Sequence, residues 1–216
     1  MDNTAIVIGA TGLVGRALTD QLADADHVSK IMTLTRRPAG NSSSKVHNQI
    51  VDFDHLENDA ASFDADLLFS CLGTTRKKAG SIAAQRRVDL DYQYKAAQFA
   101  ADNGVRHYLL VSSSGANVNS NNPYLRMKGE LEQKVQALPF HRISFFQPSL
   151  LLGQRAEFRI GEKLGSWMLP LLCAIPGLRR LRPITGEQVA AKMVQVSRQP
   201  GPALEWFRLD EIFINK

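Results

Sequence analysis

Hydrophobic positions follow two different periods along the first two thirds of the chain. Short continuous apolar runs, typical of buried parallel strands, are separated by stretches in which apolar residues recur at helical spacing. The helical spacing predicts helices at residues 13–25, 86–104 and 124–138. The apolar runs predict strands at residues 4–9, 30–37, 48–53, 65–73, 105–115 and 141–153.

This alternation predicts the α/β class: a doubly wound, mostly parallel sheet with helices on both faces. Beyond about residue 154 the alternation fades into two helical segments, near 161–175 and 186–198, and a last strand within 204–212. No repeat or low-complexity linker interrupts the sequence. We therefore predict one domain, residues 1–216, in which residues 154–216 form a small lobe that covers the substrate.

The composition bears on the number of domains and on the cellular compartment. The chain has 216 residues, 44% hydrophobic and 22% charged, which suits one large domain. Cys71 and Cys173 belong to no metal or redox spacing, and the first residues show no secretory signal, so we expect reduced cysteines and a cytoplasmic location. No metal site is predicted, because the histidines share no common spacing: His27, His47, His55, His107 and His141.

The most apolar stretch, residues 164–178, is shorter than the roughly 20 residues of a membrane-spanning helix and contains two prolines. Because basic residues follow at 179–182, one interpretation is peripheral contact with a membrane surface. We favour a buried helix, in which Trp167 and Met168 belong to the core or to the substrate pocket. The net charge of +5 comes from scattered residues, so nucleic-acid binding is not expected.

Three glycines follow the first predicted strand and open the first helix, in the run "GATGLVG" at residues 9–15. Gly9 permits a tight turn, Gly12 lets the backbone approach a pyrophosphate, and Gly15 lets the helix pack against the strand. The free N–H groups at the start of that helix would face the phosphates. A glycine triplet alone indicates only a sharp turn, but its place between strand and helix favours a Rossmann-like dinucleotide site.

The end of the second predicted strand bears on the choice between NAD and NADP. NAD sites place an acid there, whereas this chain has Arg36 and Arg37. Guanidinium groups bind the 2′-phosphate of NADP through charge-assisted hydrogen bonds, so we predict NADPH/NADP as the preferred cofactor. The alternative is a pair of solvated arginines. The basic run at 74–81 is expected to close over the cofactor phosphates, with a solvated loop as its alternative.

Further cofactor contacts are expected where the third and fourth predicted strands end, because ligands of such sheets bind at the carboxyl ends of strands. Asp52 and Phe53 would neighbour the adenine. Leu72, Gly73 and Thr74 would line the same cleft.

A possible reaction centre follows the fifth strand, in the run "SSSGANVNSNNPYLRMKGE" at residues 112–130. Tyr124 and Lys128 are one helical turn apart and share a face. A free phenol, with a pKa near 10, is a poor acid–base catalyst at neutral pH, and a nearby ammonium stabilises the phenolate. Tyr124 would donate a proton to a carbonyl oxygen while a serine orients that carbonyl. The alternative is a polar loop before an ordinary amphipathic helix.

The glycine loop, the serine-ended strand and the YxxxK pair together resemble the short-chain dehydrogenase/reductase superfamily. The GxxGxxG spacing is similar to its extended and atypical branches. The runs "SCLGTTRKKAGS", "VDLDY", "VSSSGAN", "YLRMKGELE" and "PSLLLGQRAEFRIGE" resemble the Tat-interacting oxidoreductase group, small atypical members with an NADPH site. The resemblance covers residues 5 to about 163, and only general similarity continues from residue 164.

The resemblance implies Tyr124 and Lys128 as the catalytic pair, with Ser113 as the serine and Ser112 and Ser114 as alternatives. Extended members often have an asparagine where this chain has Asp89, and a carboxylate there would pair with Lys128 and weaken its effect on Tyr124. The implied nucleotide contacts are Gly9, Thr11, Gly12, Leu13, Val14, Gly15, Arg36, Arg37, Gly73, Thr74, Tyr124, Lys128, Leu151 and Arg159.

We therefore predict an NADP(H)-dependent short-chain dehydrogenase/reductase that reduces a small carbonyl substrate by hydride transfer. The main alternative is a regulatory protein that senses NADP(H) through a protein partner with little or no turnover. A protein anchored at a membrane surface by residues 164–182 is a further alternative.

Overall fold

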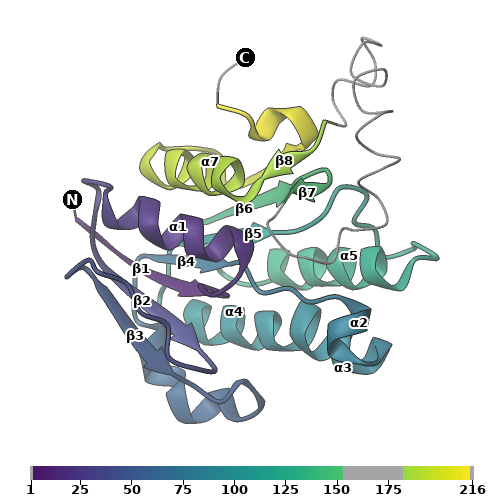
Figure 1. The fold of residues 1–216 in the computed structure, drawn as a ribbon, viewed down its shortest axis with the longest axis horizontal. Helices are drawn as coiled ribbons and strands as arrows, with labels where there is room; N and C mark the ends of the chain where they lie inside the picture. The colour runs from purple at the N-terminus through teal and green to yellow at the C-terminus, as the bar shows by residue number, and fades with distance from the viewer. Residues whose placement is uncertain (1, 153–181, 215–216) are drawn as a thin grey trace.

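The computed structural model describes residues 2–152 and 182–214. Its main feature is a seven-stranded sheet in the order β3-β2-β1-β4-β5-β6-β9, in which every neighbouring pair is parallel (Figure 1). The predicted doubly wound α/β class is confirmed. The strands are β1 (Asn3–Ile8), β2 (Val28–Thr35), β3 (Val46–Ile50), β4 (Leu67–Ser70), β5 (His107–Val111), β6 (Arg142–Gln147) and β9 (Leu204–Arg208).

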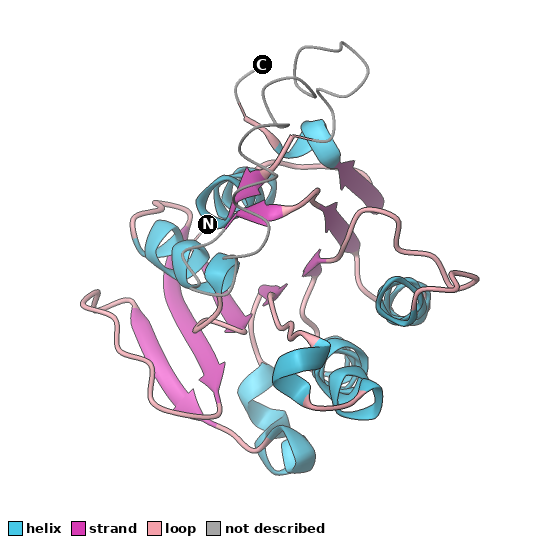
Figure 2. Cartoon of the chain, turned by 45° about the vertical axis from the view of Figure 1, so that its right-hand side comes forward, coloured by secondary structure: helices cyan, strands magenta, loops and turns pink. Residues whose placement is uncertain are grey.

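Helices cover both faces of the sheet (Figures 1 and 2). Helices α1 (Leu13–Ala23) and α7 (Gly186–Arg198) pack on one face, and α4 (Tyr92–Asp102) and α5 (Pro123–Gln136) pack on the other. The strand period of two assigns the side chains to the faces. Along β1, for example, Val7 packs with the first pair of helices, whereas Ile8 packs with the second.

The helix predicted at residues 86–104 contains a change of helical type. Helix α3 (Ile82–Arg86) continues through a π-helical turn, η2 (Arg87–Asp91), into α4. A π-turn frees backbone carbonyls from their usual partners. Here the side chain of Gln93 satisfies them, because its Nε2 donates to the carbonyls of Asp89 (2.9 Å) and Val88 (3.4 Å). Its Oε1 accepts from Ser70 Oγ of β4 at 2.8 Å, which ties the turn to the sheet.

Other short elements were not predicted. Capping side chains start two of them and also helix α3: Asp52, Thr75 and Ser81 each accept a hydrogen bond from a backbone N–H in the first turn of a helix. The strand predicted at 141–153 ends at Gln147, and a separate two-stranded ladder follows. The unpredicted elements are η1 (Phe53–Phe63), α2 (Arg76–Ala79), β7 (Leu151–Leu152), β8 (Ile184–Thr185) and η4 (Leu209–Ile212).

The C-terminal part joins the main layers. Strand β9 is the seventh strand of the sheet, and Gly186 at the start of α7 packs against Leu13 at the start of α1. The helix predicted near 161–175, with Trp167, Met168 and Cys173, lies outside the described residues, and the substrate-covering lobe stays a prediction. Within 2–152 and 182–214, no helix is long and apolar enough to cross a membrane.

A buried polar network at the amino ends of β5, β6 and β9 makes stability depend on pH. His107 Nε2 lies 2.8 Å from Ser144 Oγ, which donates to Glu205 Oε1 at 2.6 Å, and Arg142 Nε donates to the same carboxylate at 2.9 Å. Burial, reinforced by the charge of Arg142, lowers the pKa of His107 to about 3. The imidazole is therefore neutral in the folded protein but takes up a proton near pH 6.5 in the unfolded chain.

We expect the free energy of unfolding to fall as pH drops below about 6.5, by up to about 1.4 kcal/mol per pH unit from His107. Urea denaturation at pH 7.5, 6 and 5 measures this loss, and the profile of His107→Gln is expected to be flatter by about 2 kcal/mol at pH 5. Burial also lowers the pKa of His27, but this residue contributes to the pH dependence of both proteins equally. The difference between the two profiles therefore isolates the contribution of His107. Parallel profiles for the two proteins would contradict the prediction.

Candidate dinucleotide-binding and catalytic site

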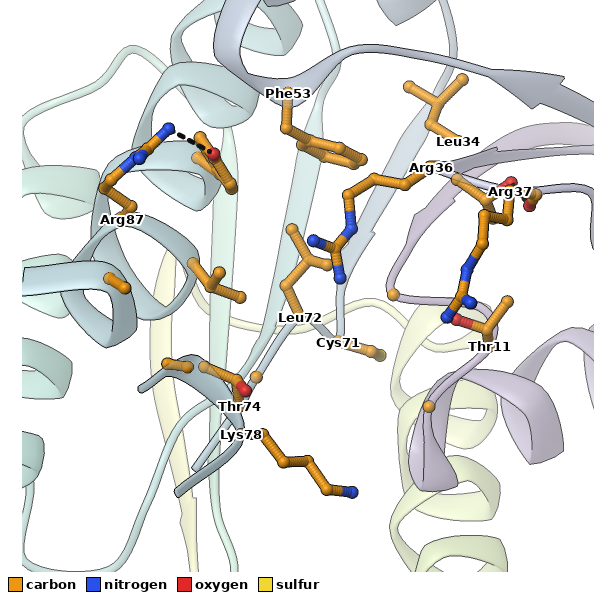
Figure 3. Close-up of a pocket in the computed structure, with 18 of the residues that line it drawn as sticks. Thr11, Leu34, Arg36, Arg37, Phe53, Cys71, Leu72, Thr74, Lys78 and Arg87 are labelled. Atoms are coloured by element: carbon orange, nitrogen blue, oxygen red, sulfur yellow. Dashed lines mark hydrogen bonds between the residues drawn. The ribbon is translucent and has the colours of Figure 1, made fainter. Parts of the chain in front are cut away.

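A cleft of about 950 Å³ opens at the carboxyl edge of the sheet, beside the ends of β1, β2 and β4 (Figure 3). Doubly wound sheets bind dinucleotides at this edge. Nine predicted cofactor residues line it: Gly9, Thr11, Gly12, Arg36, Arg37, Phe53, Leu72, Gly73 and Thr74. Lys78 and Ala79 of the basic run 74–81, which was expected beside the cofactor phosphates, also line it. The lining further includes residues that the sequence did not assign to the site: Arg16, Leu34, Thr35, Pro38, Asp54, Cys71, Ala84, Arg87, Val88 and Tyr92.

The glycine loop has no room for side chains at two of its three glycines. Gly9 has a φ of +81°, and a Cβ there would lie 2.5 Å from the backbone carbonyl carbon of Cys71. A Cβ on Gly15 would lie 2.7 Å from the carbonyl carbon of Gly9. Helix α1 starts at Gly12 with no side-chain cap and no acid in its first turn. Its first N–H groups and its positive dipole end therefore suit a phosphate.

Three loop residues predicted as contacts do not line the cleft. Val14 and Gly15 are buried under the start of α1, and Leu13 packs against Gly186. Asp52, predicted beside the adenine, is also absent from the lining. Its carboxylate accepts a hydrogen bond from the N–H of Asp54 and caps η1.

The arginines after β2 give one side of the cleft a positive charge. Arg36 extends toward the middle of the cleft and Arg37 toward Thr11 (Figure 3). Both are exposed, and no other described residue forms a hydrogen bond or ion pair with either guanidinium. Asp54 is the single acid among the described lining residues, and it is paired with Arg87. This charge pattern suits an additional phosphate.

The opposite wall of the cleft is apolar and aromatic. The rings of Phe53 and Tyr92 lie 5.6 Å apart between centroids, and Leu72 and Val88 complete a surface against which a planar base can pack. The Tyr92 hydroxyl donates to Asp54 at 2.6 Å, which holds the ring in place.

Lys128 is buried, with 2% of its surface exposed. Its Nζ is 3.4 Å from Asp89 Oδ1 and 3.5 Å from the carbonyl oxygen of Val111, at the end of β5. The other oxygen of Asp89 accepts from the backbone N–H of Thr74 at 3.1 Å. Burial raises the pKa of Asp89, and Lys128 acts in the opposite direction. The expected Asp89–Lys128 pair is therefore present, and Tyr124 stands half-buried one turn earlier on α5.

The three serines after β5 have different environments. Ser112 is buried and its hydroxyl donates to Glu132 of α5, which also accepts from Gln147 Nε2 at 2.9 and 3.1 Å. Among the residues that the structure describes, the Ser113 hydroxyl has one long contact, 3.4 Å, with the carbonyl oxygen of Ser114. Ser112 is thus engaged, while the Ser113 hydroxyl is free to turn toward a ligand. Sequence reasoning missed Glu132, although its spacing of four from Lys128 places it on the same helical face.

The serine loop is pressed against α5 at a glycine. The N–H of Asn117 donates to the carbonyl oxygen of Leu125 at 3.1 Å. A Cβ on Gly129 would lie 2.5 Å from the backbone nitrogen of Val118. The glycine after Lys128 therefore sets how closely the loop that carries the serines approaches the helix that carries Tyr124.

Of the two remaining predicted cofactor residues, only one is described, and it does not line the cleft. Leu151 is half-buried in β7, and Arg159 lies outside the described residues. Burial raises the pKa of Cys71 to about 12, so its thiol stays protonated and is a poor nucleophile at neutral pH. Across residues 2–152 and 182–214, no three His, Cys, Asp or Glu side chains are grouped to hold a metal ion.

Comparison with known proteins places this cleft in context. A family of NAD(P)H-binding proteins matches residues 9–141. Protein HTATIP2 of Rattus norvegicus is 40% identical over 76% of this chain and 69% of that protein. Protein FMP52 of Eremothecium gossypii is 37% identical, covering 73% of this chain and 70% of that protein. FMP52-1 of Scheffersomyces stipitis is 34% identical over 91% of this chain and 88% of that protein.

Solved structures share the fold at much lower identity. A short-chain dehydrogenase/reductase superfamily protein of Agrobacterium tumefaciens with bound NAD has a TM-score of 0.72 and 13% identity, with 95% of this chain and 77% of that chain covered. MoeE5 in complex with UDP-glucuronic acid and NAD has a TM-score of 0.71 and 15% identity, with 95% and 76% covered.

The relatives also correct one expectation. The predicted cytoplasmic location is contradicted, because the FMP52 proteins of several fungi are named as mitochondrial. The cysteine and N-terminal patterns on which the prediction rested do not distinguish compartments inside the cell. The family assignment itself agrees between the sequence motifs, the fold and the relatives. This chain belongs to the NAD(P)H-binding family, in the atypical short-chain dehydrogenase/reductase group that includes HTATIP2 and the FMP52 proteins.

Proposed function

We propose that this protein is an NADP(H)-dependent oxidoreductase that reduces the carbonyl group of a small molecule. One observation carries the proposal: Asp89 joins the buried Lys128 ammonium to the backbone of Thr74, which lines the dinucleotide cleft. This short link supports a reaction centre on α5 beside the cofactor.

The cleft fits a dinucleotide phosphate by its own chemistry. The absence of side chains at Gly9 and Gly15 and the uncapped start of α1 leave backbone N–H groups open to a phosphate. The guanidiniums of Arg36 and Arg37, which have no partner among the described residues, add positive charge. NADPH bound in this cleft would supply a hydride for the carbonyl carbon. Tyr124 donates its hydroxyl proton to the carbonyl oxygen, so the carbonyl compound becomes an alcohol. Lys128 stabilises the phenolate that remains, and Ser113 donates a hydrogen bond that orients the carbonyl.

The Asp89–Lys128 pair also favours a second candidate function. A carboxylate 3.4 Å from the ammonium offsets its charge and reduces the stabilisation that it gives a phenolate. A protein with this pair can bind NADP(H) and respond to it with little turnover. The second candidate is therefore a regulator that reports the NADP(H) state to a protein partner. NADPH consumption with a panel of aldehydes, ketones and quinones tests the first function against the second.

Replacement of Arg36 and Arg37 by alanine is expected to weaken NADPH binding roughly 10- to 100-fold for each charge-assisted hydrogen bond that the change removes. NADH lacks the 2′-phosphate, so its dissociation constant is expected to change less than about threefold. Calorimetric titration with both cofactors measures the two constants. Arg198→Ala, at an exposed arginine in the last turn of α7, is the matched control. Equal losses of affinity for NADPH and NADH would argue against 2′-phosphate recognition by these arginines.

A further inference from the structure

The two arginines of the proposed NADP(H) site stand on an exposed turn, which raises the question of what holds that turn in place. Arg36, Arg37 and Pro38 follow β2 directly and are all exposed. An arginine side chain has many rotamers, so an unbraced turn would lose both backbone and side-chain freedom when it binds a phosphate. A turn that hydrogen bonds already hold in place binds the phosphate more tightly, because part of its conformational freedom has been lost before binding.

A single side chain from the neighbouring strand braces both ends of this turn. Asn48 of β3 stands beside Thr33 in the parallel register of β2 and β3. Its Nδ2 donates to Thr35 Oγ1 at 2.8 Å and to Thr33 Oγ1 at 2.9 Å. Its Oδ1 accepts from the backbone N–H of Ala39 at 3.0 Å. Thr35 Oγ1 in turn donates to the carbonyl oxygen of Arg37 at 2.7 Å, so the network reaches the arginine backbone itself.

The chemistry of this network requires a carboxamide. Its nitrogen must donate to the threonine hydroxyls while its oxygen accepts from Ala39, and neither a carboxylate nor an alkyl group does both. Thr33 and Thr35 are 2% and 5% exposed, so loss of the donor leaves buried hydroxyl groups with fewer partners. The network lies at the β2 side of the cleft, and none of these hydrogen bonds involves the glycine loop.

We propose that Asn48 is a positioning residue that determines cofactor specificity by fixing the Arg36–Arg37 turn for the 2′-phosphate of NADP(H). The inference rests on the proposed NADP(H) preference. Because the network holds only the turn after β2, its loss acts on the cofactor with the 2′-phosphate and leaves binding of the remaining dinucleotide largely unchanged. Asn48 therefore contributes to specificity without a contact of its own to the cofactor.

The test is the ratio of the NADPH and NADH dissociation constants in the full chain. We expect Asn48→Ala to weaken NADPH binding about 5- to 20-fold and NADH binding less than about twofold. Gln49→Ala is the matched control, since Gln49 is the next residue of β3 and its amide donates to Asp59 and Ser62, outside the arginine turn. It removes two amide hydrogen bonds from the same strand and is expected to leave the ratio unchanged.

The outcomes separate this inference from the proposed function. If the wild-type protein prefers NADPH and Asn48→Ala keeps that preference, the positioning role is overturned while the NADP(H) function stands. If Asn48→Ala weakens the binding of NADPH and NADH equally, the positioning role is again overturned, because the substitution has then changed only the general stability of the protein. If the wild type shows no preference at all, the proposed NADP(H) specificity fails first. Should Asn48→Ala not fold, the same ratio is measured for Thr35→Val, which removes the hydrogen bond from Asn48 to Thr35 and the one from Thr35 to the carbonyl oxygen of Arg37.

Discussion

Replacement of Tyr124 by phenylalanine is expected to lower NADPH-dependent reduction of a carbonyl substrate by roughly 10²- to 10⁴-fold. The phenylalanine keeps the ring at the start of α5 and removes only the hydroxyl that donates the proton. Lys128 and its link through Asp89 to Thr74 stay in place, so the dissociation constant for NADPH is expected to be unchanged. Initial rates and a cofactor titration on the same preparations measure the two effects separately.

Tyr94→Phe provides the matched control, because Tyr94 lies on α4 with its ring against Lys134 and does not line the cleft. It is expected to retain full turnover. Turnover that survives Tyr124→Phe would remove the catalytic role from this residue. A wild-type protein that binds NADPH but reduces none of the panel would favour the regulator, and a biological effect that Tyr124→Phe leaves intact would favour it further.

Substitution of Gly129 by alanine is expected to destabilise the protein by about 1–3 kcal/mol and to reduce turnover at least tenfold. In a helix with no close neighbour, replacement of glycine by alanine stabilises the protein by about 1 kcal/mol. A destabilised Gly129→Ala protein would therefore indicate a steric clash at this position. Here the new Cβ would lie 2.5 Å from the backbone nitrogen of Val118, and the serine loop must move away from α5. The distance between the Ser113 hydroxyl and Tyr124 would then change. Urea denaturation and initial rates measure the two consequences.

Gly40→Ala is the control for the glycine substitution, since a Cβ at that exposed position meets nothing within 4 Å. It is expected to change stability by less than about 1 kcal/mol in either direction. A Gly129→Ala protein as stable and active as the wild type would show that the close approach of Asn117 and Val118 to the helix has no part in the reaction.

The parts of the fold with a regular period were predictable from sequence. The helix predicted at 186–198 is found at Gly186–Arg198, because its apolar face has a clear helical spacing and a capping box starts it at Thr185. The π-turn at Arg87–Asp91 was not predictable, because it depends on the hydrogen bond between Gln93 and Ser70, which lie on different elements. Local patterns do not encode such tertiary contacts.

The candidate site likewise contains residues whose positions follow from the sequence and residues whose positions do not. The positions of Gly9, Arg36 and Thr74 follow from their places at strand ends, and all three line the cleft. Lys78 lines the cleft as part of the basic run 74–81, which was expected there. Arg87 also lines the cleft, but the helical spacing at 86–104 does not indicate the π-turn on which it lies. Asp52 shows the opposite case, where a plausible ligand residue is used to cap a helix.

The position of β9 has a consequence for how the protein is made. During translation, β6 can pair with β5 as soon as it is synthesised, but its outer edge stays open until β9 follows. Arg142 and Ser144 have no Glu205 to bind during that interval. An open strand edge is the feature through which nascent chains associate with one another or engage chaperones. The outer edge of β6 is therefore covered only after residues 204–208 have left the ribosome.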